Sequence, residues 1–213
     1  MVTFARTPGL VPQVASPLNP GARARLEPQI QSLYDHQLII GTQSNPVNFF
    51  SQGWTNGRTP RETNAPVFPL PSPLVFLVAG FGVHLVQRPI PNAAMVITDV
   101  TDWNSLLYQG VLSFTVGMQG KGYLTGNLYQ FPAGIGQYGF VTTGGATAGN
   151  IALIASNGVP AVGKYFRIKG APITLTQNET FLAQIGFPAS AVAMSNSHTV
   201  CIILRGVQGK QIG

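Results

Sequence analysis

The stretch Leu74-Val-Phe-Leu-Val-Ala-Gly-Phe-Gly-Val-His-Leu-Val86 is the most informative part of the chain. Apart from His84 it is apolar, and it is shorter than the roughly 20 residues of a membrane-spanning helix. Its valines and aromatic residues favour a β-strand. A strand that is apolar on both faces is typical of the middle of a layered protein, where the opposite sheet and a neighbouring subunit cover it. The segment Val200-Cys-Ile-Ile-Leu204 has the same character.

Short β-branched and aromatic runs separated by Gly, Pro and Asn continue on both sides of this stretch, as expected for strands joined by turns. The predicted strands are Gln37–Gly41, Val47–Phe50, Leu74–Val86, Met95–Asp99, Leu106–Met118, Tyr123–Gln130, Ile151–Ala155, Tyr165–Lys169, Ile173–Thr176, Thr180–Phe187 and His198–Gly206. Within them, Leu112-Ser-Phe-Thr-Val116 alternates in polarity, which predicts one exposed face. No long helical segment is expected between the strands, which argues against a parallel βαβ fold.

We therefore predict an all-β protein whose residues 37–213 form one β-sandwich domain, either a single jelly roll or another Greek key. Residues 1–36 contain Pro8, Pro12, Pro17, Pro20 and Pro28. This spacing excludes a long helix or a central strand, because proline lacks the backbone N–H that both need. The segment is predicted to be an extended N-terminal arm, with a short helix over 27–37.

Charged residues make up only 8% of the chain, compared with about 25% in an average soluble domain. Large uncharged surfaces usually belong to contacts with other protein, so this composition favours self-assembly. Trp54 and Trp103 lie in segments that read as loops, where each is a candidate interface anchor or, alternatively, a core aromatic residue.

The net charge of +6 comes from few acids rather than from a dense basic run. Arg6, Arg23 and Arg25 on the arm are candidate contacts for nucleic acid or anionic lipid inside an assembly, and the alternative is ordinary solvated charge.

Prolines replace the apolar region of a signal peptide in Met1–Asn19, so we expect a soluble protein made in the cytoplasm. Cys201 is the only cysteine and is expected to be a buried, unreactive thiol.

The sequence contains two weak signals for chemistry. Gly134-Ile-Gly-Gln-Tyr-Gly139 matches a dinucleotide-binding pattern, but the residues after it do not favour a helix and no acid follows at the required distance. Asp99 and Asp102 form a close acidic pair that suits either a hydrolytic dyad or, as we prefer, a polar turn over 99–104. We expect no catalytic residue, cofactor, metal site or small-molecule substrate.

The three histidines, His36, His84 and His198, are far apart in the chain. His84 lies within the apolar stretch, where a core or interface histidine with a hydrogen-bonded ring is the expected role. A metal site would need these residues to meet in space, and the sequence alone does not indicate that they do.

Several fragments occur in a suggestive order: Asn48-Phe-Phe50, Glu62-Thr-Asn64, Leu70-Pro-Ser-Pro-Leu-Val-Phe-Leu-Val78, Phe81-Gly-Val-His-Leu85, Tyr165-Phe-Arg-Ile168, Pro172-Ile-Thr-Leu175, Glu179-Thr-Phe181 and Val200-Cys-Ile-Ile-Leu-Arg-Gly-Val207. The series resembles jelly-roll capsid proteins of tailless icosahedral bacterial viruses. This resemblance implies a structural protein of the virion, made in the host cytoplasm, whose copies tile a shell together with other virion proteins. It supplies no catalytic residue, and the chain is too short for the two barrels of double-jelly-roll shell proteins.

Two alternatives to the shell protein stay open. One is a receptor- or glycan-binding attachment module of the virion, with a shallow site formed by Tyr138 and the glycine-rich segment 140–149. The other is a β-sandwich hydrolase that uses Asp99 and Asp102.

Overall fold

The computed structural model describes residues 13–16, 19–26, 29–65, 68–86, 97–117, 120–132, 138–143, 151–156, 165–187 and 192–212. The elements in chain order are β1 (Gln13–Ser16), β2 (Asn19–Leu26), β3 (Gln29–Ile39), β4 (Val47–Phe49), η1 (Trp54–Asn56), β5 (Leu74–Val86), α1 (Ile97–Gln109), β6 (Val111–Val116), β7 (Lys121–Asn127), η2 (Leu128–Gln130), β8 (Tyr138–Thr143), β9 (Ile151–Ser156), β10 (Phe166–Arg167), β11 (Ile173–Leu175), β12 (Phe181–Gly186) and β13 (His198–Ile212).

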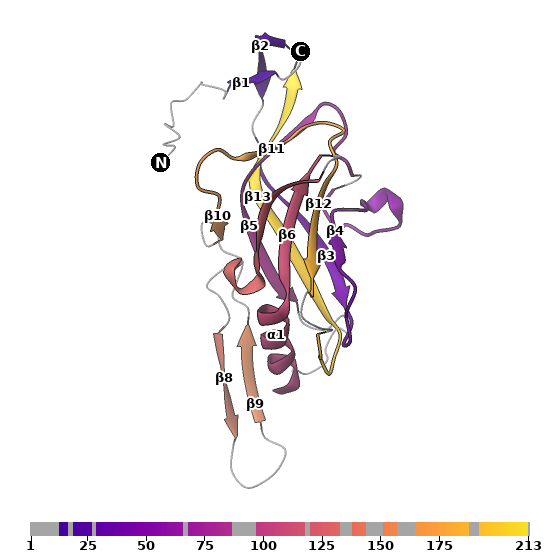
Figure 1. Ribbon diagram of the computed structural model, residues 1–213, viewed down its shortest axis with the longest axis vertical. Helices are drawn as coiled ribbons and strands as arrows, with labels where there is room; N and C mark the ends of the chain where they lie inside the picture. Colours follow the sequence, from indigo (N-terminus) through magenta and orange to yellow (C-terminus); the bar gives the residue numbers. More distant parts are fainter. Residues whose placement is uncertain are drawn as a thin grey trace.

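Two antiparallel sheets form the body of the molecule (Figure 1). Sheet 1 has the order β3-β13-β5, and β10 and β11 both pair with the free side of β5. Sheet 2 has the order β4-β12-β6-β7. The predicted all-β sandwich is therefore confirmed at the level of two layered antiparallel sheets.

The two apolar stretches are neighbours at the centre of sheet 1. Strand β5 has the predicted bounds, and β13 runs beside it from the Thr199–Val86 pair to the Lys210–Leu74 pair. Every residue of 200–204 is buried. Cys201 and Ile203 face away from the other sheet, and Tyr34 of the same chain packs against them. The outer cover predicted to come from a neighbouring subunit is thus supplied in part by the chain itself.

The N-terminal part differs from the prediction. Residues 29–39 form strand β3 instead of a helix, and β3 pairs with β13 along its whole length. The boundary placed at residue 37 consequently falls inside a strand of sheet 1. Further upstream, β1 and β2 form a hairpin, and β2 also pairs with the far end of β13. Local proline spacing did not reveal β3 because its partner lies about 170 residues away in the sequence.

The segment predicted to be a strand and a polar turn is helix α1. Buried positions at 99, 102, 103, 106 and 107 follow the i, i+3, i+4 spacing of one helix face. Threonine, valine, aspartate and asparagine favour strands and turns locally, and burial of this face overrides that preference. Gly110 follows the last residue of the helix, and only glycine fits there because a side chain would collide with Leu128 and the Leu106 carbonyl.

The two hairpins extend the long axis of the molecule (Figure 1). The β1–β2 hairpin lies near the C-terminus, and the β8–β9 hairpin projects from the opposite end beyond α1. The chain continues from Gly139 as strand β8, whereas a dinucleotide site would need a helix there. In the described part of the chain, no helix has the length and apolar character needed to cross a membrane.

Candidate functional site

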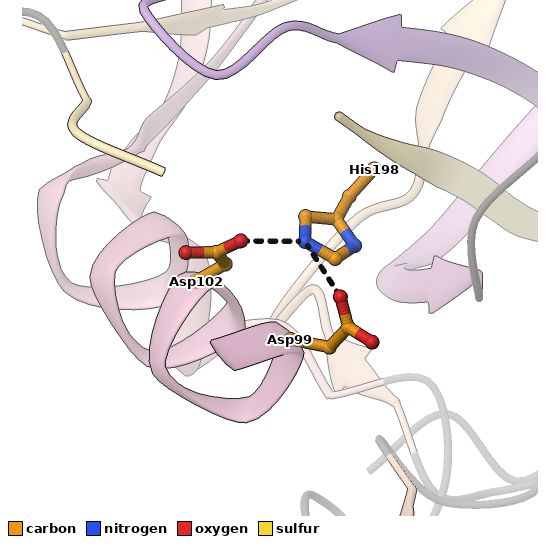
Figure 2. A group of neighbouring side chains, drawn as sticks. All are labelled: Asp99, Asp102 and His198. Carbon is orange, nitrogen blue, oxygen red and sulfur yellow. Dashed lines mark hydrogen bonds and ion pairs between the residues drawn. The ribbon is translucent and has the colours of Figure 1, made fainter. Parts of the chain in front are cut away.

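Among the residues that the structure describes, Asp99, Asp102 and His198 form a buried cluster of ionisable side chains (Figure 2). All three have exposures of 0–2%. His198 Nε2 lies 3.2 Å from Asp102 Oδ2 and 3.9 Å from Asp99 Oδ1. On the other side of the imidazole, Trp103 Nε1 donates a hydrogen bond to His198 Nδ1 over 3.1 Å. The cluster therefore joins helix α1 to the first residue of β13.

Both carboxylates also accept hydrogen bonds from the segment before β13. The backbone N–H groups of Ser195 and Asn196 donate to Asp102 Oδ1 and Oδ2, each over 2.9 Å. The Asn196 side-chain amide donates to Asp99 Oδ1 over 3.1 Å. Asp99 lies in the first turn of α1, where the helix dipole favours a negative charge. These donors replace the hydrogen bonds to water that the two carboxylates lose when they are buried.

The hydrogen bonds define which nitrogen of His198 carries the proton. An indole N–H can only donate, so Nδ1 must accept from Trp103. The neutral ring then carries its proton on Nε2 and donates it to Asp102. A histidine that binds a metal through Nε2 normally donates its other N–H to an acceptor, and here that position receives a donor instead. The three ligand atoms are close enough to surround a cation, but this donor set does not suit one.

The cluster is also poorly placed for catalysis. A hydrolytic dyad must meet substrate and water, and these carboxyl groups are closed off from solvent in the core. Two grooves formed by described residues are lined by other side chains. The arrangement instead fastens α1 to the sandwich. Sequence reasoning missed the link because it read 99–104 as a turn, in which the two acids would not share one helix face with Trp103.

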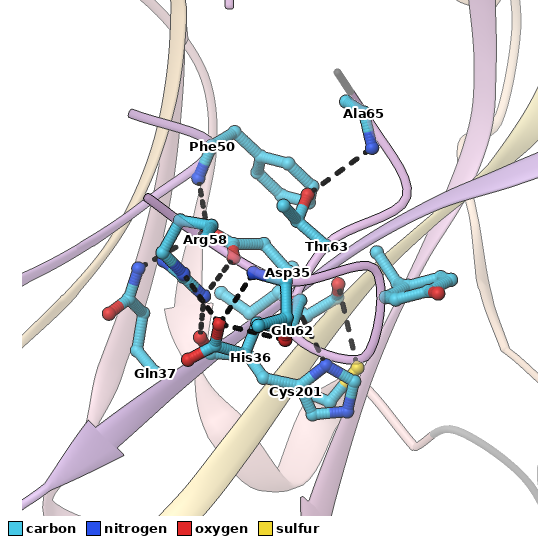
Figure 3. Close-up of polar contacts among 12 residues, drawn as sticks. Asp35, His36, Gln37, Phe50, Arg58, Glu62, Thr63, Ala65 and Cys201 are labelled. Atoms are coloured by element: carbon cyan, nitrogen blue, oxygen red, sulfur yellow. Dashed lines mark hydrogen bonds and ion pairs between the residues drawn. The ribbon is translucent and has the colours of Figure 1, made fainter. Parts of the chain in front are cut away.

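A second polar network fixes residues 50–64 against the edge of β3 (Figure 3). Its centre is Asp35, which is fully buried and lies 2.8 Å from Arg58 Nη2. Arg58 also donates to the His36 carbonyl. Glu62 lies 3.7 Å from Arg58 Nε and accepts from the Thr59 backbone and hydroxyl. An isolated antiparallel β-bridge pairs the backbones of Asp35 and Thr63 at this edge of sheet 1.

The network also holds a strained residue. Phe50 has a φ of 61°, which is unusual for a bulky side chain, and its N–H donates to Asp35 Oδ2 over 2.6 Å. The Phe50 ring packs against Phe68 and Phe181 in the core. Burial raises the pKa of Asp35, and the bonds from Phe50 and Arg58 offset part of that rise. Asp35 and Arg58 were not recognised in the sequence, because they are 23 residues apart and neither lies in a motif.

Among the predicted interface anchors and arm arginines, Trp103 joins the buried aspartate cluster through its hydrogen bond to His198. Trp103 is 3% exposed and packs in the core, which is the alternative role considered for it. Arg23 and Arg25 lie two residues apart on β2, and their side chains lie outside the described part of the chain. Trp54 belongs to η1, but its side chain lies outside the described part of the chain, as does the whole of Arg6. The described structure thus does not bring these residues together in one site.

His36, Cys201 and His84 form a row across the outer face of sheet 1. Cys201 pairs with His36 on one side and with His84 on the other. Burial raises the pKa of the Cys201 thiol to about 12, in agreement with the predicted unreactive cysteine. His84 was predicted to have a hydrogen-bonded ring. Its buried Nδ1 instead has no hydrogen-bond partner among the described residues.

From the burial of His84, we predict that the protein loses stability in mild acid. Burial lowers the pKa of His84 below its ordinary value of 6.5, and nearby His36 lowers it further. The unfolded chain then binds this proton first as the pH falls, so the free energy of unfolding decreases below about pH 6.5. We expect His84→Leu to lose less stability than the wild type between about pH 7.5 and about pH 5, as measured by urea denaturation. If the wild type and His84→Leu lost the same free energy of unfolding between the two pH values, this role of His84 would be contradicted.

In its described residues, the chain is an antiparallel β-sandwich with the α-helix α1 packed at its end. No protein-family model matches the chain, and no similar protein was found among the curated proteins or among the solved structures.

Proposed function

We propose that this chain is a jelly-roll capsid protein that assembles into the icosahedral shell of a virion. The observation that carries the proposal is the order of the strands. If β10 and β11 count as one interrupted strand, the sandwich strands from β3 to β13 number one to eight. Sheet 1 then has the order 1-8-3-6 and sheet 2 the order 2-7-4-5. Two Greek keys wound together into a jelly roll have this order, which is frequent in viral shells and also occurs in lectins and cupins.

The outer face of sheet 2 supports a role in packing against other proteins. Asn48, Gln184 and Ser113 form a row across β4, β12 and β6. Gln184 donates to Asn48 over 2.8 Å, and Ser113 donates to the Gln184 carbonyl over 3.5 Å. A row of uncharged polar groups can be buried in a contact at a lower desolvation cost than charged groups. Neighbouring copies and other virion proteins are the partners that this face suits.

Two exposed tyrosines offer an anchor for such contacts. Tyr108 at the end of α1 is 70% exposed, and Tyr129 in η2 is 53% exposed. Their rings lie 5.8 Å apart and form one aromatic surface. Aromatic residues are enriched at the centres of protein interfaces because they bury a large area with few rotatable bonds. Arg23 and Arg25 remain candidates for contact with packaged nucleic acid or an internal membrane.

The test of this proposal is the size of the purified full-length protein, measured by light scattering and negative-stain electron microscopy at low and moderate salt. We expect closed shells or regular rings. The double variant Tyr108→Ser/Tyr129→Ser should assemble less completely, and Asn104→Ala on an exposed position of α1 serves as the matched control. A wild-type protein that remains a monodisperse monomer under all conditions would overturn the proposal.

The attachment module is the second candidate, and the β8–β9 hairpin favours it. This hairpin projects from the end of the sandwich (Figure 1), and Tyr138 is the first residue of its strand β8. Saturable binding of a glycan by the monomer, lost when residues 138–156 are replaced by a short turn, would favour this candidate over the shell protein.

A further inference from the structure

A groove opens between the two sheets at the edge formed by β7, β10 and β11. Its volume is about 490 Å³, which is within the range of about 300–1,000 Å³ typical of small-molecule sites. Its lining comes from β5, β7, β10, β11 and the segment between β10 and β11. The groove is separate from the buried aspartate cluster and from the Asp35 network.

The interruption of one edge strand explains why the groove exists. Phe166 and Arg167 pair with β5 as β10, and the pairing resumes at Ile173 as β11. Between them the chain leaves the sheet through Gly170, which has a φ of 104°. An uninterrupted strand would place side chains against β7 at this point, so the interruption leaves part of the space between the sheets open.

The groove has an apolar floor and a cationic rim. Phe81 and Ile173 are buried at its base, and the partly buried Leu124, Phe166 and Ile168 extend the apolar surface. Lys169 lines the rim and is exposed. On the β7 side, Lys121 lies outside the lining itself, and its ammonium is 5.0 Å from the centre of the ring of Tyr123, which lines the groove. The lining contains no carboxylate, and neither lysine forms an ion pair within the described part of the chain.

The distribution of acids makes this rim attractive to an anion. Asp35, Asp99 and Asp102 are buried elsewhere, so they do not neutralise the surface. Glu62 is engaged with Arg58 and Thr59, and Glu179 with the backbone and hydroxyl of Thr176. The positive charge at the groove is therefore not balanced by any described neighbouring carboxylate.

We propose that the groove binds the acyl chain of an anionic amphiphile, whose head group lies between Lys169 and Lys121. An apolar slot with cations only at its mouth matches a ligand that is a hydrocarbon at one end and a carboxylate or phosphate at the other. A nucleotide strand matches less well, because its bases and phosphates alternate along the chain whereas this site has one apolar and one charged end. A second copy of the chain also matches less well, since its basic surface would meet the same lysines. The inference does not rest on assembly, because the site lies within one molecule.

The experiment uses the monomeric or dissociated full-length protein and saturated fatty acids of increasing length, which displace a fluorescent fatty-acid probe. Affinity should rise about fourfold for each added methylene group until the groove is full, and then level off at one ligand per chain. The methyl ester of the best acid should bind at least about threefold more weakly, since it lacks the charge that the lysines attract.

Two variants test the location of the ligand. Lys121→Met/Lys169→Met should weaken the acid by about threefold or more and leave the methyl ester unchanged, and Arg61→Met is the matched charge control. Ala171→Trp should block the groove and abolish binding of both ligands. Ala171 is exposed, so this change leaves the core intact. The matched control is Ser51→Trp, which occupies the uncharged groove formed around Phe50 and Phe181.

A second arm distinguishes the source of the ligand. Flotation with vesicles that contain anionic phospholipid should recover the wild type but not Ala171→Trp if a membrane lipid is the ligand. Binding of free acid without flotation would identify a free amphiphile. Binding that does not level off with chain length, or that survives Ala171→Trp, would overturn the proposal.

Discussion

Replacing Asp102 with alanine is expected to lower the free energy of unfolding by about 3–5 kcal/mol. Asp102 accepts hydrogen bonds from Ser195, Asn196 and His198. His198 is fully buried, so removal of the carboxylate leaves its ring N–H without this acceptor and away from water, and the backbone N–H groups of Ser195 and Asn196 lose the same acceptor. Equilibrium urea denaturation monitored by tryptophan fluorescence measures this loss, because Trp103 lies within the same cluster.

Two further variants separate the loss of these hydrogen bonds from other effects of the Asp102→Ala substitution. Asp102→Asn keeps the size of the side chain but turns an amide donor towards groups that already donate, and we expect a smaller but clear loss. Asn104→Ala on the exposed side of the same helix should change stability by less than about 0.5 kcal/mol. If Asp102→Ala were as stable as Asn104→Ala, the cluster would not be the link between α1 and β13 that the structure indicates.

The substitution Arg58→Met is expected to cost about 3–5 kcal/mol, because it leaves the Asp35 carboxylate buried without its counter-charge. The methionine retains apolar packing volume, so loss of the charge dominates. The exposed neighbour Arg61 provides the matched control, and Arg61→Met should be nearly neutral.

The double variant Asp35→Asn/Arg58→Met tests the cause of this effect. An asparagine at 35 still offers an oxygen to the Phe50 N–H but carries no charge, so the double variant should be more stable than Arg58→Met alone. Strictly additive losses would contradict the coupling between the two residues.

The same pair makes a pH-dependent prediction. Burial already raises the pKa of Asp35, and loss of Arg58 removes a factor that lowers it. Folded Arg58→Met therefore binds a proton more tightly than the unfolded chain, whose carboxyl has the ordinary value of 3.8. Its stability deficit relative to the wild type should shrink as the pH falls towards that value.

The strands at the centre of the sandwich could be predicted because their signal is local. Residues 74–86 and 200–204 are apolar and rich in β-branched side chains, and any fold that buries them uses them as inner strands. The alternation of 112–116 was visible for the same reason, and the burial pattern of β6 follows it. These features together determined the all-β class without reference to the rest of the chain.

The errors arose where distant residues decide the local conformation. Strand β3 contains an inward-facing Asp35 and follows a proline-rich segment, and only pairing with β13 and the charge of Arg58 make it a strand. Helix α1 consists largely of residues with turn or strand preferences, and its stability depends on burial against the sandwich and on donors at 195, 196 and 198.

The sequence by itself thus determined the antiparallel sandwich, the position of its inner strands and the character of Cys201. Only the tertiary structure decided which polar groups meet. Asp99 and Asp102 contact His198, which lies almost one hundred positions later in the sequence, and Asp35 contacts Arg58 across a chain reversal. Local patterns carry the burial preference of each residue, whereas a buried charge is tolerable only beside specific partners, and those partners are brought together by folding.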